Sequence, residues 1–163
     1  MRWFAAIAIL AFGTAAAEGQ VFSAERSRPI VKTDAVQYLY PEQISVAAGR
    51  PSAVVLHFRV APGLHINSHT PSGEFLIPTT FSIPEGMGVR LDRADYPPGV
   101  MISLAMDPRT KLSVYTGEFA IRARIVAYAG NHLVQAKLRY QACDNNQCMP
   151  PKTINLAIDV IGK

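Results

Sequence analysis

The sequence lacks several features that are typical of common functional classes of protein. It has only two cysteines and one tryptophan in 163 residues, and no long run of like charge. The net charge is +4, but the basic residues are spread along the chain without the basic patch and aromatic platforms that nucleic-acid binding needs. Beyond the first 17 residues, no stretch keeps apolar residues at helical spacing for a dozen positions. These absences exclude a nucleic-acid-binding protein and a helical fold.

The first 17 residues have the features of an export signal. Arg2 supplies a positive charge, an apolar run from Trp3 to Phe12 follows, and Ala15-Ala16-Ala17 offers a cleavage site. The apolar run is too short to span a bilayer. We therefore expect cleavage near Ala17, a flexible lead-in over residues 18–31, one domain over residues 32–163, and a periplasmic or secreted location where disulfides persist.

The rest of the chain alternates apolar and polar residues in short segments separated by proline and glycine. Such a pattern is typical of half-buried β-strands. It predicts an all-β fold, a two-sheet antiparallel sandwich, with a closed barrel as the alternative. Residues 129–131 are predicted to form a hairpin turn, and residues 101–111, where alternation is weaker, a loop. The predicted strands are 36–40, 44–46, 54–60, 64–66, 79–83, 89–91, 119–128, 133–143 and 154–160.

The two cysteines, Cys143 and Cys148, flank a four-residue polar segment between two strand-like runs. This length suits a hairpin that brings the cysteines within disulfide distance. By the alternation of the upstream strand, Cys143 falls on the polar face. A disulfide closing so short a loop stabilises a protein by only about 2 kcal/mol, against almost 5 for a loop of about 100 residues. The pair therefore suits thiol–disulfide exchange better than a stabilising cross-link.

The ordered motifs of this chain resemble those of one known family. From about residue 36 to 160, the chain is similar to the N-terminal periplasmic domain of the thiol:disulfide interchange protein DsbD. The most specific match surrounds the cysteine pair, and four shorter motifs support it. The matching stretches are Tyr140-Gln141-Ala142-Cys143, Cys148-Met149-Pro150-Pro151-Lys152-Thr153, Pro62-Gly63-Leu64-His65-Ile66-Asn67, Ile83-Pro84-Glu85-Gly86, Tyr96-Pro97 and Val114-Tyr115.

The resemblance implies an immunoglobulin-like sandwich whose cysteine pair relays electrons. It implies that Cys148 forms the intermolecular mixed disulfide and that Cys143 resolves it. In the family the electrons come from a thioredoxin-like domain, supplied by a membrane-embedded section, and pass to periplasmic oxidoreductases, including proteins of cytochrome c maturation. Because this chain ends at Lys163, we expect its donor to be a separate protein and the chain to be a monomer without a cofactor.

Residues around the pair are candidates for tuning it. Lys152, with Lys137 and Arg139, is expected to favour a thiolate, whereas Asp144 opposes one. Tyr140 belongs to the motif that leads into Cys143.

Two further segments bear on the access of a partner to Cys148. Pro150 and Pro151 restrict the backbone, and either hold Cys148 in an attackable position or only set the turn. The family shields its cysteines with a loop that carries acidic and aromatic residues. Residues 101–111 correspond to that loop but contain no aromatic residue, so Met101, Leu104 or Met106 is expected to cover the disulfide instead.

Other functions have less support. A metal site would draw on His65 and His69, whose spacing in a strand-to-loop region does not bring them together, so no metal is expected. Ser68 and Ser72 near His69 form no nucleophile motif. The alternative to exchange is a secreted immunoglobulin-like interaction module whose disulfide is purely structural.

Overall fold

Twelve strands and no helix form the regular structure of the residues that the computed structural model describes, namely 34–40, 43–104 and 107–163. Nothing in these ranges is a helix long and apolar enough to cross a membrane. The predicted signal segment, its cleavage point at Ala17 and the lead-in over 18–31 lie outside the described residues, so these assignments stay predictions.

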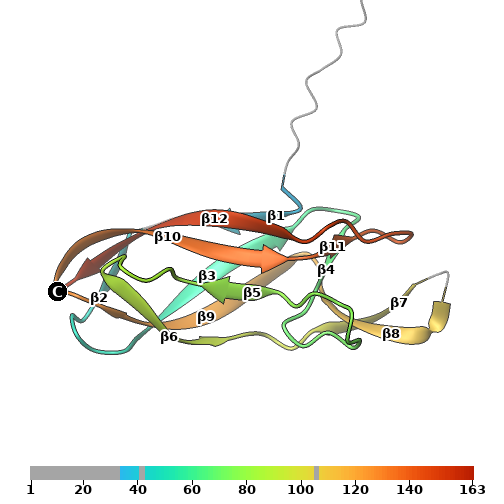
Figure 1. Cartoon of the computed structure of the whole chain (residues 1–163), viewed down its shortest axis with the longest axis horizontal. Helices are drawn as coiled ribbons and strands as arrows, with labels where there is room; N and C mark the ends of the chain where they lie inside the picture. Colours follow the sequence, from blue (N-terminus) through green and yellow to red (C-terminus); the bar gives the residue numbers. More distant parts are fainter. Residues whose placement is uncertain (1–33, 41–42, 105–106) are drawn as a thin grey trace, which may run out of the picture. The chain divides into compact units, whose positions relative to one another are not determined.

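The strands form three four-stranded sheets, and their arrangement confirms an all-β, immunoglobulin-like fold (Figure 1). Sheet A contains β1 (Val36–Leu39), β3 (Ser52–Val60), β9 (Glu118–Ala127) and β6 (Val89–Asp95), in that order. Sheet B contains β2 (Ile44–Val46), β12 (Lys152–Gly162), β10 (Gly130–Tyr140) and β5 (Thr80–Ser82). Sheet C contains β11 (Ala142–Cys143), β4 (His65–Asn67), β8 (Asp107–Tyr115) and β7 (Val100–Leu104).

Sheets A and B make the sandwich, and its core follows the alternation in the sequence. Every second residue of β3 is buried from Val54 to Val60, and β10 and β12 repeat the pattern. The inward side chains of both sheets join one hydrophobic cluster, which includes Leu56, Leu138 and Leu156. Burying one face of each strand against the other sheet removes this apolar surface from water, which is the main stabilising term of such a fold.

The link between β9 and β10 is not the predicted hairpin turn. β9 pairs with β3 and β6 in sheet A, whereas β10 pairs with β12 and β5 in sheet B. The turn around Gly130 therefore carries the chain from one sheet to the other. Alternation alone did not reveal this, because both strands bury one face against the same core whether they pair or face each other.

Within residues 101–111, the described residues 101–104 and 107–111 are not the predicted loop. They belong to strands β7 and β8, which pair antiparallel, with Met101 opposite Ser113 and Ser103 opposite Lys111. Their alternation is weak because β7 is an edge strand with exposed apolar residues, Val100 and Met101 being 56% and 55% exposed. The side chains of Leu104 and Met106 lie outside the described residues, so their predicted covering role is untested.

One pairing departs from an antiparallel sandwich. β2 runs parallel to β12, with Ile44 opposite Val160 and Val46 opposite Gly162. The chain reaches this edge directly after β1 in sheet A, so β2 enters sheet B in the direction of β12. Sheet C lies at the end of the sandwich away from the C-terminus and carries one cysteine on β11 (Figure 1).

Candidate functional site

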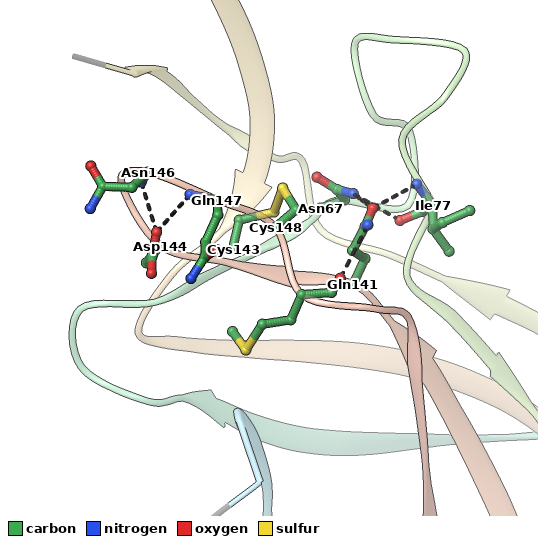
Figure 2. Close-up of a disulfide and its surroundings, with 9 residues drawn as sticks. Asn67, Ile77, Gln141, Cys143, Asp144, Asn146, Gln147 and Cys148 are labelled. Atoms are coloured by element: carbon green, nitrogen blue, oxygen red, sulfur yellow. Dashed lines mark hydrogen bonds between the residues drawn. A yellow bond between two sulfur atoms is a disulfide. The ribbon is translucent and has the colours of Figure 1, made fainter. Parts of the chain in front are cut away.

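The cysteine pair closes a tight hairpin that begins where β10 ends (Figure 2). Cys143 and Cys148 are joined by a disulfide, with their Cα atoms 3.9 Å apart. The Asp144 amide donates to the Gln147 carbonyl at 3.0 Å, and the Met149 amide donates to the Ala142 carbonyl at 2.8 Å. These backbone bonds confirm the predicted hairpin.

Asp144 orders the turn of this hairpin. Its carboxylate Oδ1 accepts hydrogen bonds from the backbone amides of Asn146 at 2.7 Å and Gln147 at 2.8 Å (Figure 2). These two bonds stabilise the charged form and lower the pKa of Asp144. From the sequence, Asp144 was expected only to act as a negative charge beside Cys143. In the structure its side chain also stabilises the turn of the hairpin.

The two halves of the disulfide differ sharply in exposure. Cys143 is only 1% exposed, whereas Cys148 is an exposed residue. The prediction that Cys143 lies on the polar face is wrong. The alternation of β10 ends at Tyr140, and the chain then leaves sheet B to pair with β4, so that Cys143 lies opposite His65. Contact with a second sheet buries the side that β10 leaves to solvent.

Gln141 links three segments around the disulfide. Its Oε1 accepts from Asn67 Nδ2 at 3.1 Å and from the Ile77 amide at 3.3 Å, and its Nε2 donates to the Met149 carbonyl at 3.2 Å (Figure 2). The side chain thereby ties the residue after Cys148 to β4 and to the loop that contains Ile77. Gln141 lies within the cysteine motif, but the sequence predicted no role for it. Its role depends on contacts with residues far away in the chain, which only the structure shows.

The sequence did not predict that His65 is buried. It is 4% exposed, and its Nε2 has no hydrogen-bond partner among the described residues. Burial lowers the pKa of His65, and the Asp144 carboxylate opposes this with a smaller effect.

His65 and His69 make separate contacts. The ring of His69 stacks on Tyr96 at 3.7 Å, and its Nδ1 lies 3.0 Å from the Thr79 carbonyl. Among the described residues, no three His, Cys, Asp or Glu side chains gather as metal ligands do. The absence of a metal from this protein stays a prediction.

The residues predicted to support the pair occupy different environments. Tyr140 is 1% exposed in the core, which raises the pKa of its hydroxyl. Lys152 lies opposite Tyr140 and forms an ion pair with Asp34, and this contact raises the pKa of Lys152. Pro150 and Pro151 are both exposed, directly after the hairpin.

Lys137 and Arg139 lie on the exposed face of β10, as the alternation predicted. An effect of these two charges, or of Lys152, on a cysteine thiolate stays a prediction.

Comparison with solved structures finds similar domains, two of which are described here. The N-terminal domain of Neisseria meningitidis DsbD, in the reduced form, has 18% identity and a TM-score of 0.48, over 71% of this chain and 82% of that one. The N-terminal periplasmic domain of Proteus mirabilis ScsB has 16% identity and a TM-score of 0.47, over 76% of this chain and 44% of that one. No protein with curated annotation matches the sequence.

The family comparison covers most of the chain. Residues 35–159, which include every strand of the three sheets apart from the last residues of β12, match the family described as thiol:disulfide interchange protein DsbD, N-terminal. The match spans the cysteine hairpin and the segments that surround it. The chain therefore belongs to the DsbD N-terminal domain family.

Proposed function

We propose that this domain performs thiol–disulfide exchange through Cys143 and Cys148. The observation that carries the proposal is the unequal exposure of the two residues, with Cys148 accessible and Cys143 buried behind it. Exchange requires an attacking sulfur to reach one sulfur of the disulfide. An exposed cysteine at the end of a rigid sandwich meets this requirement, and membership of the DsbD N-terminal family agrees with it.

The exposure also supports distinct roles for the two cysteines. A partner thiolate attacks Cys148 Sγ, a bond forms between the two sulfurs, the Cys143–Cys148 bond breaks, and its electron pair leaves on Cys143. In the reverse direction, Cys148 attacks a partner's disulfide and Cys143 then displaces the partner. Cys148 is thus the intermolecular cysteine and Cys143 the resolving one, because a partner protein cannot approach a residue that is 1% exposed.

The exposed prolines after the hairpin fit this arrangement. Pro150 and Pro151 have no amide hydrogen and restricted backbone angles, so they limit how far Cys148 and Met149 can move. Gln141 holds the Met149 carbonyl from the other side at 3.2 Å. We propose that the two prolines and the Gln141 bond together hold Cys148 at the surface in a position that a partner can attack.

The proposed partners follow from the family. We propose that a thioredoxin-like or membrane-embedded donor, present as a separate protein, reduces this domain. The domain then reduces oxidised periplasmic proteins, including oxidoreductases of cytochrome c maturation. This assignment includes export by residues 1–17 and action of residues 32–163 as a monomer in the periplasm.

A trapping experiment tests the proposal. The Cys143→Ser variant, reduced and mixed with an oxidised thioredoxin-like protein, is expected to accumulate a disulfide-linked complex through Cys148 on a non-reducing gel. The matched Cys148→Ser variant is expected to form none, because its remaining thiol is buried. If the wild-type disulfide is reduced no faster than an unrelated surface disulfide, the pair is structural and the domain is an interaction module.

A further inference from the structure

His65 is placed to act on the buried cysteine. In the antiparallel pairing of β4 with β11, His65 lies directly opposite Cys143, and Ile66 lies opposite Ala142. Directly opposite residues project to the same face of a sheet, with Cβ atoms about 4.5–5.5 Å apart. Ile66 and Ala142 face the hydrophobic cluster, so His65 and Cys143 share the other face.

The face that His65 and Cys143 share is buried, so the lack of a hydrogen-bond partner for His65 Nε2 needs an explanation. His65 and Cys143 are 4% and 1% exposed, and His65 Nε2 has no hydrogen-bond partner among the described residues. Leaving a buried polar atom without a partner is costly, so native proteins keep few such atoms. Reduction of the disulfide creates a hydrogen-bond donor on this face, the thiol of Cys143, directly opposite His65.

We infer that His65 Nε2 is the proton acceptor for the Cys143 thiol when Cys143 resolves a mixed disulfide. The inference rests on the proposed function and deepens it. In the oxidised protein Cys143 has no proton to give, so an unpaired Nε2 is the arrangement expected in this state. Reduction supplies the missing donor.

The step balances without a further reactant. The Cys143 thiol gives its proton to His65 Nε2, and the resulting thiolate attacks Cys148 Sγ. The Cys143–Cys148 bond forms, the bond from Cys148 to the partner breaks, and the partner leaves as a thiolate with the electron pair. The imidazolium then releases its proton to solvent. In the reverse direction the imidazolium protonates the Cys143 sulfur as it leaves.

The surroundings of His65 favour this role. Burial lowers the pKa of the imidazole, which keeps it neutral and able to accept a proton near neutral pH. Asp144, after β11, is the charged group that acts on it and stabilises the imidazolium once formed. On β8, Tyr115 lies opposite Ile66 and so projects to the other face of the sheet, where its hydroxyl donates to the Pro97 carbonyl.

The test follows the two exchange steps of the reduced full chain with oxidised glutathione as the probe. Acid quenching and mass spectrometry separate the mixed disulfide from the final disulfide. In His65→Gln, the resolving step is expected to slow by about 10-fold at neutral pH, since a free thiol is only a few per cent ionised there. The attack of Cys148 is expected to stay within about twofold of the wild type.

The pH profile separates proton transfer from a structural effect. Above the pKa of His65 the resolving rate of the wild type is expected to level off, because the base is fully neutral. In His65→Gln it is expected to rise about tenfold per pH unit up to the thiol pKa. His57→Gln, which changes an exposed histidine on β3, is the matched control and should behave as the wild type.

A resolving rate in His65→Gln within about twofold of the wild type, with the same pH profile, overturns the inference while leaving the proposed function intact. Failure of Cys148 to react with glutathione at all overturns the proposed function instead. If His65→Gln does not fold, the decision passes to nitrogen NMR of the His65 ring. Reduced wild type and Cys143→Ala are expected to differ in the Nε2 shift, and identical shifts overturn the inference.

Discussion

The sandwich and the cysteine end of this domain differ in what they bury. In β3, β10 and β12 of the sandwich, apolar residues point inward and polar residues point to solvent. The cysteine end, meaning sheet C with residues 68–79 and 141–149, buries both faces of strands β4 and β11. Within the described ranges the buried polar residues all belong to this end, namely His65, Asn67, Ser68, Thr79 and Ser113.

The polar interior of the cysteine end is held by specific hydrogen bonds. Ser68 and Ser113 join their hydroxyls at 2.8 Å, and Thr79 Oγ1 donates to the Asn67 carbonyl at 2.6 Å. Such bonds add little net stability but fix orientation. The sandwich therefore supplies most of the stability, and the cysteine end supplies a defined geometry around the disulfide.

A substitution that opens a cavity in the core of the sandwich is expected to have the largest effect on stability. Leu56 is fully buried on β3, and Leu56→Ala is expected to lower the free energy of unfolding by about 2–5 kcal/mol, measured by urea titration. Val55→Ala, at a neighbouring residue that is 47% exposed, is the control. The exchange rate of the folded Leu56→Ala protein should be unchanged. A parallel loss of exchange would mean that the two regions are not separate.

Reduction of the disulfide should cost less than a core cavity. Opening a loop this short is expected to lower the free energy of unfolding by about 2 kcal/mol, measured by urea titration with and without a phosphine reductant. The double variant Cys143→Ala with Cys148→Ala should not respond to the reductant. A loss above about 4 kcal/mol would be more than loop entropy explains and would make the pair a structural element.

Removal of Gln141 tests the hydrogen bonds of the cysteine end. Gln141→Ala is expected to cost about 1–2 kcal/mol, because the Ile77 amide and the Met149 carbonyl lose a partner. Amide hydrogen exchange of Ile77 should accelerate. Gln135→Ala, at an exposed position of β10, is the matched control and should change neither quantity. Equal effects of the two variants would contradict the linking role of Gln141.

The buried histidine should give the cysteine end a pH dependence. The folded pKa of His65 is lowered, so the unfolded chain takes up a proton that the folded chain refuses. The free energy of unfolding is therefore expected to fall as the pH drops below about 6.5, the ordinary histidine value. His65→Gln should flatten this part of the curve and His57→Gln should not. Unchanged slopes in both would show that His65 does not titrate differently on folding.

The smallest effect is expected at the Lys152–Asp34 ion pair. Both side chains are about half exposed, at 51% and 46%, and such pairs add little. Asp34→Asn is expected to leave the urea midpoint within experimental error and the exchange rate unchanged. A change in the exchange rate would mean that Lys152 acts on the cysteines after all, as the sequence suggested.

Much of the fold was predictable from the sequence, because alternating apolar and polar residues indicate a strand with one buried face and one exposed face. The strands containing Leu56, Leu138 and Leu156 were all predicted, as was the hairpin between the cysteines. The pairing of β7 with β8 was missed because β7 is an edge strand with exposed apolar residues such as Val100 and Met101, so its apolar and polar residues do not alternate clearly. The crossing at Gly130 was missed because alternation does not say which strands pair.

The sequence by itself determined the strands of the sandwich, the spacing that lets two cysteines bond, and the motifs that place the chain in its family. Each of these depends on residues close together in the chain. Only the tertiary structure decided that Cys143 is buried and Cys148 exposed, and that His65 lies opposite the buried one. The reason is physical: β4 and β11 are far apart in the sequence, and their pairing covers a face that local alternation assigns to solvent.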